Sequence, residues 1–234
     1  MTHGQPAVAL RGVSKRYRAR PILEGLDLTV TDGQVVGLIG PNGCGKTTVL
    51  RIVAGLVQPS DGEVWVGGYP LHTHPGHMAP SIGVLFDPPG LLPHLTGWQN
   101  LRMLASLRHA IDEELVRQWM RRVGLDSTDR KRVGAYSQGM LQRLGLAQAL
   151  MESPNILLLD EPTNALDPQS VELVATLIRE QQARGAAIVL ASHYLEEVAR
   201  VCTDVFRMVD GCLVRATESD LKRLKSTDGE PPQL

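Results

Sequence analysis

The feature that most constrains this 234-residue chain is a glycine-rich segment, GPNGCGKT, at residues 40–47. An apolar run, VVGLI, precedes it at 35–39, and a helical pattern follows over residues 46–56. Glycine permits backbone dihedrals and close approaches that other residues resist. The N–H groups of such a loop, together with the positive end of the following helix, favour anions. The segment therefore predicts a strand–loop–helix unit that binds a chain of phosphates.

The spacing of this segment matches the Walker A pattern of triphosphate-binding proteins, G-x-x-x-x-G-K-[ST]. In that pattern Lys46 reaches the terminal phosphates, the Thr47 hydroxyl binds Mg²⁺ and Thr48 donates to an inner phosphate. A chance glycine-rich turn is the alternative, and the flanking strand and helix patterns argue against it. Cys44 stands at a variable position, so no redox role is assigned to it. The expected nucleotide contacts of this segment are Gly40, Pro41, Asn42, Gly43, Cys44, Gly45, Lys46, Thr47 and Thr48.

Two adjacent acids end a second apolar run, NILLLDE, at residues 155–161. Phosphoryl transfer needs charge neutralisation and an aligned nucleophile. Acids at the carboxyl end of a central strand, beside the phosphate loop, meet both needs. We expect Asp160 to hold Mg²⁺ and Glu161 to polarise the attacking water. A solvated turn is the alternative, which the presence of the phosphate loop disfavours.

Hydrophobic periodicity predicts the elements of the rest of the chain. Short alternating runs over residues 7–39 and 62–71 predict strands, with Asp32-Gly33 and Asp61-Gly62 as turn dipeptides between them. Apolar residues at helical spacing predict a helical lobe over residues 88–153.

Strand and helix patterns alternate after this lobe. The sequence predicts a strand at 155–160, a helix at 168–184, a strand at 186–191 and a helix from about residue 194. Such alternation predicts a mainly parallel sheet with helices on its faces.

Composition limits the partners and the compartment. A formal net charge of −1 gives no electrostatic footprint for nucleic acid. No window approaches the roughly 18 to 20 apolar residues that a membrane-spanning helix needs, and the first residues lack the layout of a signal peptide. The three cysteines have no Cys-x-x-Cys spacing, which favours reduced thiols in a cytosolic protein. His72, His74 and His77 either lie in a solvated loop, the favoured interpretation, or ligate a metal.

The segment YSQGMLQR at residues 136–143 decides between the many classes of nucleotide-binding protein. It resembles the signature sequence of the ABC family, LSGGQ followed by a Gln-Arg pair. Ser137 is a good N-cap for the helix that follows, and Gly139 leaves its first turn uncrowded. The resemblance implies that Ser137 and Gly139 face the γ-phosphate held by an opposite subunit.

Three further features resemble the same family. The segment PTNALD at 162–167 resembles its D-loop, although Asp167 before Pro168 also predicts a helix N-cap. His193 follows an apolar run and resembles the switch histidine, which contacts the γ-phosphate and the attacking water. Tyr17 resembles the aromatic residue that stacks on adenine.

The resemblance covers residues 7–215 and implies the fold. We expect an α/β protein with a P-loop NTPase (RecA-like) core, a mainly parallel sheet, an N-terminal antiparallel β subdomain and an inserted helical signature subdomain. As one ABC ATPase domain, residues 1–234 would divide into a nucleotide-binding core at 7–87 and 154–215, a helical subdomain at 88–153 and a tail at 216–234.

The resemblance also implies the activity and the partners. We expect an ATP-binding and ATP-hydrolysing subunit that uses ATP and Mg²⁺, with Lys46, Glu161 and His193 as catalytic residues. Its partners would be transmembrane permease subunits and a second ATPase subunit, identical or related, and no nucleic acid. The expected location is cytoplasmic, peripheral on the cytoplasmic face of the cell membrane.

Two departures from the common pattern point to a subgroup. Asp87 stands where most members have the Q-loop glutamine, and it is expected to lie at the Mg²⁺ site. Gln138-Gly139-Met140 replaces Gly-Gly-Gln. Both resemble exporters of the bacitracin- and lantibiotic-resistance type, which favours export of drugs, peptides or lipid-like substrates. The alternatives are a soluble ABC ATPase that acts on ribosomes or DNA, and a nucleotide-binding regulator without turnover.

Overall fold

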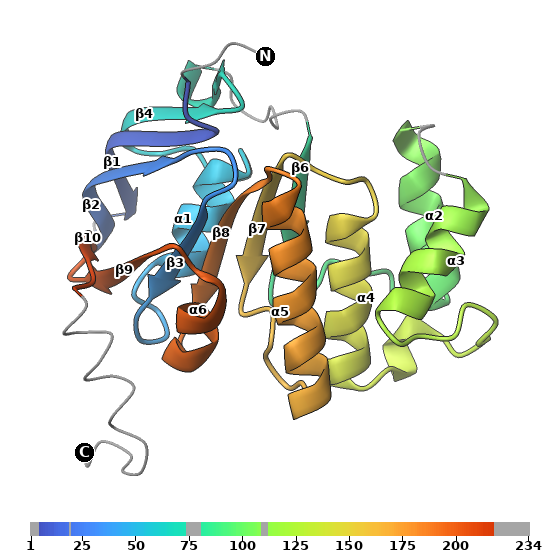
Figure 1. Cartoon of the computed structure of the whole chain (residues 1–234). Coiled ribbons are helices and arrows are strands. Elements are labelled where there is room, and N and C mark those ends of the chain that lie inside the picture. Colours follow the sequence, from blue (N-terminus) through green and yellow to red (C-terminus); the bar gives the residue numbers. More distant parts are fainter. Residues whose placement is uncertain (1–4, 19, 74–80, 109–111, 218–234) are drawn as a thin grey trace.

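The computed structural model describes residues 5–18, 20–73, 81–108 and 112–217, and Figure 1 shows their arrangement. Within these residues an antiparallel sheet of four strands, here the smaller sheet, has the order β2-β1-β4-β5. Its strands are β1 (Val8–Tyr17), β2 (Arg20–Val30), β4 (Asp61–Val66) and β5 (Tyr69–Pro70). The antiparallel N-terminal sheet expected from the sequence is therefore present.

The larger sheet has six strands in the described part of the chain, in the order β10-β9-β3-β8-β7-β6. Neighbouring strands from β9 to β6 are parallel, and β10 runs antiparallel to β9. The expectation of a mainly parallel sheet is confirmed. Its strands are β3 (Val35–Ile39), β6 (Ile82–Leu85), β7 (Ile156–Asp160), β8 (Ala187–Ser192), β9 (Asp204–Val209) and β10 (Cys212–Arg215).

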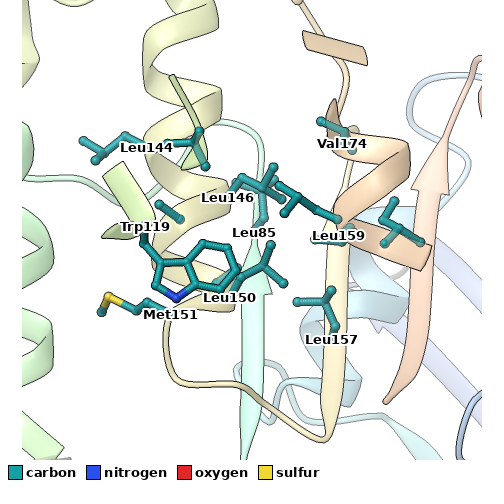
Figure 2. Packing of buried hydrophobic residues seen from close by; sticks show 14 of the residues in the cluster. Leu85, Trp119, Leu144, Leu146, Leu150, Met151, Leu157, Leu159 and Val174 are labelled. Carbon is teal, nitrogen blue, oxygen red and sulfur yellow. The ribbon is translucent and has the colours of Figure 1, made fainter. Parts of the chain in front are cut away.

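Helices cover both faces of the larger sheet (Figure 1). One face packs on α1 and the other on α4, α5 and α6, while α2 and α3 lie beyond α4. Side chains of β7 alternate between the two sides: Leu158 joins the cluster around α1, whereas Leu157 and Leu159 pack with Leu146 of α4 and Val174 of α5 (Figure 2). The helices are α1 (Lys46–Val53), α2 (Gly97–Arg108), α3 (Glu113–Arg122), α4 (Gln138–Leu150), α5 (Pro168–Ala183) and α6 (Leu195–Val201), with short 3-10 turns at Leu71–Thr73 and Val133–Ala135.

Two helix starts follow the expected capping chemistry. The Ser137 hydroxyl accepts a hydrogen bond from the Met140 N–H at 3.3 Å and begins α4. The Asp167 carboxylate accepts one from the Ser170 N–H at 2.9 Å and begins α5. Both N-caps predicted from the sequence are confirmed, and they fix where the helices beside β7 begin.

Two local predictions in the smaller sheet are wrong. Asp61 and Gly62 form the start of β4 rather than a turn, because Gly62 packs directly on β1. A Cβ on Gly62 would lie 2.5 Å from the Gly12 carbonyl oxygen, so a glycine is required for this approach. The strand expected over 62–71 ends at Val66, since Gly67 and Gly68 both have positive φ and turn the chain into β5.

Of the three histidines considered as possible metal ligands, only His72 lies within the described residues. His72 Nδ1 lies 3.1 Å from the Val64 carbonyl oxygen and 3.2 Å from its backbone N. His74 and His77 lie outside the described residues. No helix within the described ranges is long and apolar enough to cross a membrane.

Candidate functional site

A cavity of about 400 Å³ opens at the carboxyl ends of β3, β7 and β8, where the N-terminus of α1 meets the larger sheet. The residues that line it come from five separate stretches of the chain. They are Tyr17, Ile22, Pro41, Asn42, Gly43, Gly45, Lys46, Thr47, Thr48, Asp87, Asp160, Glu161, Asn164 and His193. Most residues singled out in the sequence therefore share one pocket.

The glycine-rich loop joins β3 to α1 through backbone that only glycine adopts easily. Gly45 has a φ of 113°, and a Cβ there would lie 2.8 Å from a Leu23 methyl group. Gly43 has a φ of 80° with open space around it, so its glycine serves conformation rather than packing. The loop thereby directs the first turn of α1 toward the cavity. The backbone N–H groups at the start of a helix favour a bound anion.

Lys46 is the buried cation of this pocket, with 4% of its surface exposed. Its Nζ donates to the Gly40 carbonyl oxygen at 2.7 Å and lies 3.5 Å from Glu161 Oε1. Buried charges need partners because desolvation is costly. These contacts hold the ammonium inside the loop, beside the Glu161 carboxylate that follows β7.

Asp160 ends β7 with a carboxylate that is 2% exposed. Burial raises the pKa of Asp160 above its usual value, and a hydrogen bond with Thr47 opposes that rise. Among the described residues its Oδ1 has no hydrogen-bond partner. A buried carboxylate oxygen without a hydrogen-bond partner, next to a threonine hydroxyl, provides the oxygen ligands that a hard divalent cation prefers.

The described residues hold no group of three or more His, Cys, Asp or Glu side chains placed to bind a metal ion by themselves. Mg²⁺ commonly uses one or two carboxylates together with the phosphates of a bound nucleotide. Asp160 and Thr47 therefore fit a cation that arrives with a triphosphate better than one held in a cage of protein ligands.

Glu161 and His193, which both line the cavity, are in direct contact. His193 Nδ1 lies 2.8 Å from Glu161 Oε2, and the His193 backbone N–H donates to the same oxygen at 3.2 Å. Glu161 has a φ of 47°, and its carbonyl oxygen accepts a 2.7 Å hydrogen bond from Gln142 Nε2. This role of Gln142, a buried amide on α4, was not predicted from the sequence. The only signal was a polar residue on the packed side of a helix.

Tyr17 ends β1 at the mouth of the cavity and is 46% exposed. Lys15 Nζ lies 5.0 Å from the centre of its ring. An exposed ring at the rim, beside Ile22, is available to stack on a flat ligand.

Four expected contacts lie outside the cavity lining. Gly40 takes part through its carbonyl oxygen, which accepts a hydrogen bond from Lys46, and Cys44 lines a second cavity of about 580 Å³. Ser137 and Gly139 lie at the start of α4, where a Cβ on Gly139 would be 3.1 Å from the Ala165 carbonyl oxygen. The structure thus does not bring Ser137 and Gly139 to the phosphate loop of their own chain.

Asp87 lies just after β6 and lines the cavity. Its Oδ2 accepts a 2.8 Å hydrogen bond from Asn164 Nδ2, a contact between residues 77 positions apart that no local pattern predicts. The charge of Asp87 also contributes to the raised pKa of Asp160, after burial and the charge of Glu161.

Comparison with known proteins agrees with this geometry. The family model described as ABC transporter matches residues 23–164. The chain is 37% identical over 208 residues to the uncharacterized ABC transporter ATP-binding protein YdbJ of Bacillus subtilis, covering 88% of this chain and 68% of YdbJ. It is 34% identical over 208 residues to the bacitracin transport ATP-binding protein BcrA of Enterococcus faecalis, with the same 88% and 68% coverage.

Solved structures give the same result. The fold matches an ATP-binding subunit of an ABC transporter with a TM-score of 0.83 and 28% identity, over 96% of this chain and 95% of that one. It matches a dimeric bacterial ABC transporter cassette with a TM-score of 0.80 and 25% identity, over 89% and 97% of the two chains. This chain therefore belongs to the ABC transporter family, as one of its ATP-binding, ATP-hydrolysing subunits.

Proposed function

We propose that ATP hydrolysis by this chain powers an exporter, with the chain bound to transmembrane subunits at the cytoplasmic face of a cell membrane. One observation carries the catalytic part of the proposal. The Glu161 carboxylate lies between Lys46 and His193 in a cavity that also holds the buried Asp160. Phosphoryl transfer requires groups of this kind together: a buried lysine, a carboxylate oxygen free to bind a cation, and a second acid held in place by a neighbouring side chain.

In this proposal residues 40–48 surround the phosphates and Tyr17 stacks on the adenine. The loop places the N-terminus of α1 and the Lys46 ammonium where terminal phosphates carry their charge. On binding, the phosphates replace the contacts that Lys46 now makes with Gly40 and Glu161.

Thr47 and Asp160 would hold Mg²⁺, with Asp87 nearby. The Asp160 Oδ1, which has no hydrogen-bond partner among the described residues, and the neighbouring Thr47 hydroxyl support this assignment. When bound, the cation neutralises charge on the phosphates. The buried position of Asp160 keeps this part of the site away from bulk water, which strengthens electrostatic interactions there.

Glu161 would orient the attacking water, and His193 would orient Glu161. An ionised carboxylate has no proton to donate, so Nδ1–H of His193 is the donor in their 2.8 Å contact. A base held by a second group is the usual arrangement for activating a weak nucleophile. The Gln142 side-chain amide and the Asn164 backbone N–H both donate to the Glu161 carbonyl oxygen, and these two bonds would keep the Glu161 carboxylate in position.

The site would be completed by a second ATPase subunit. Ser137 and Gly139 form an open helix start that lies off the pocket of their own chain. The dimeric cassette of similar fold supports a two-subunit assembly. ATP would favour closure because its γ-phosphate contacts both chains and so binds the closed state more tightly.

Turnover by the purified chain tests the catalytic proposal. Replacing Glu161→Gln keeps the size of the side chain and removes the charge that polarises water. We expect Mg-dependent ATPase activity that rises faster than linearly with protein concentration and falls about 100-fold or more in the variant. Activity in Glu161→Gln equal to that of the unchanged chain would contradict the role of Glu161.

Export is supported by the relative named for bacitracin transport and by the departures at Asp87 and Gln138-Gly139-Met140. Deleting the gene in its host should lower the inhibitory concentration of bacitracin-like and lantibiotic-like peptides. The unchanged gene should restore resistance, and the Glu161→Gln gene should not. Unchanged peptide sensitivity combined with the loss of uptake of a nutrient would identify an importer instead.

A further inference from the structure

The segments that follow β6 and β7 are joined by one side-chain contact at the edge of the nucleotide cavity. Asn164 Nδ2 donates to Asp87 Oδ2 at 2.8 Å, and both side chains line the cavity. The two strands are parallel neighbours in the larger sheet, so the segments leave it at the same edge. The contact therefore ties together two loops that the sheet only brings close.

The chemistry of Asp87 suits a hydrogen-bond donor at position 164. An ionised carboxylate accepts hydrogen bonds and donates none, unlike a glutamine. Here it shares the cavity with Asp160 and Glu161, and like charges at short range repel. The amide of Asn164 supplies a donor without adding another charge. Asp87 and Asn164 are thus matched to each other.

Asn164 is itself held firmly by the turn after β7. Its backbone N–H donates to the Glu161 carbonyl oxygen at 3.1 Å, and the same oxygen accepts the Gln142 amide at 2.7 Å. Ala165 follows with a φ of 60° and lies against Gly139 at the start of α4. A short series of contacts therefore runs from Asp87 through Asn164 to Glu161 and α4.

We infer that Asn164 is a positioning residue that fixes the Asp87 carboxylate in the nucleotide cavity, so that the Asp87–Asn164 pair sets the relation between the segment after β6 and the segment that carries Glu161. The inference rests on the proposed function, because its main readout is turnover. It concerns the pairing of these two side chains and does not depend on whether Asp87 also contacts Mg²⁺.

Exchanging the two side chains tests the pairing directly. Asn164→Asp alone places two carboxylates against each other and removes the donor. In an Asp87→Asn background the same change restores the bond with reversed polarity, because the amide introduced at position 87 can donate to the carboxylate introduced at position 164. We expect Asn164→Asp to lower kcat by about tenfold when Asp87 is present, the scale of one lost hydrogen bond to a charged group. In the Asp87→Asn background the loss should nearly vanish.

The matched control is Asn155→Asp, the same substitution at an exposed residue before β7 that does not line the cavity. It should leave kcat unchanged in both backgrounds. The urea unfolding of all variants is measured in parallel. If the wild-type chain alone turns over too slowly, the same comparison is made on the affinity for ATP.

Three results would overturn the inference. Equal losses for Asn164→Asp in both backgrounds, in turnover and in unfolding, mean that the two side chains do not interact. Coupling in the unfolding free energy without coupling in turnover or ATP affinity means that the pair only stabilises the fold. A large effect of Asn155→Asp means that the change acts through charge alone. Failure of the proposed function would look different, since it would show as unchanged activity in Glu161→Gln.

Discussion

At the scale of single residues, the cavity is organised around Lys46. Its ammonium is almost fully buried, yet it contacts a carbonyl oxygen of the loop and one oxygen of Glu161. The other oxygen of Glu161 contacts His193. One acid thus bridges the two groups expected to meet the terminal phosphate. Because Lys46 and His193 share this acid, changes at one of them should alter the position of the other.

Tyr17 gives a prediction at this scale. Tyr17→Ala should weaken ATP affinity by about 1–3 kcal/mol, because base–aromatic stacking contributes that much. Tyr17→Phe should keep the affinity, since the ring rather than the hydroxyl makes the contact. Turnover at saturating ATP should change little in either variant. Titration with a fluorescent ATP analogue measures the affinity.

Tyr69 is the control for this prediction. It is 54% exposed on β5, comparable to Tyr17, and does not line the cavity. Tyr69→Ala should leave ATP affinity unchanged. If Tyr17→Ala binds ATP as tightly as Tyr69→Ala, then Tyr17 does not stack on the base and another residue must hold the adenine.

At the scale of secondary structure elements, the sequence predicts what depends on local pattern. The strand before the glycine-rich loop, the strand that ends in Asp160 and the capped helices α4 and α5 all carry strong local signals. Short strands that are defined by pairing with distant segments carry no such local signal. β6 consists of only four residues, IGVL, which is too short for a clear pattern. β9 and β10 are defined by the pairing of β9 with β3 and of β10 with β9, and a local pattern does not reveal these pairings.

The junction of β3, β9 and β10 gives a prediction about pH. Asp204 Oδ2 accepts a 2.7 Å hydrogen bond from Gln34, and its other oxygen pairs with Arg215. The hydrogen bond with Gln34 is the main cause that lowers the pKa of Asp204 below 3.8, its ordinary value, with Arg215 adding to it. A lowered pKa in the folded state means that this carboxylate stabilises the fold above its unfolded pKa, and that the contribution is lost as pH falls.

Asp204→Asn should therefore lower the free energy of unfolding at pH 7 by about 1 kcal/mol, the net value of a weakened hydrogen bond. The difference from the unchanged chain should shrink as pH falls below about 4, where the native carboxylate also becomes protonated. Urea unfolding between pH 3 and pH 7 measures both. Glu24→Gln, at an exposed residue of β2, serves as the control. A difference that grows toward acid pH would mean that the folded state favours protonated Asp204, which contradicts a lowered pKa.

At the scale of the whole molecule, the sequence predicts the architecture and most of the pocket, because motif residues sit at strand ends that a parallel sheet gathers at one edge. It does not predict the contacts that join the motifs. The bonds from Gln142 to Glu161 and from Asn164 to Asp87 connect residues 19 and 77 positions apart, and their partners are set by tertiary packing. The fold also explains why Ser137 and Gly139 lie away from their own pocket.

We propose that ATP joins two copies of this chain, or this chain and a related one, around shared sites. The most direct measurement is the molar mass of the Glu161→Gln variant in solution, by light scattering, without nucleotide and with ADP or ATP. We expect a monomer without nucleotide and with ADP, and a dimer with ATP that is lost in Ser137→Arg. A Glu161→Gln variant that binds ATP and remains monomeric at saturating concentration would contradict a site completed by a second copy of this chain.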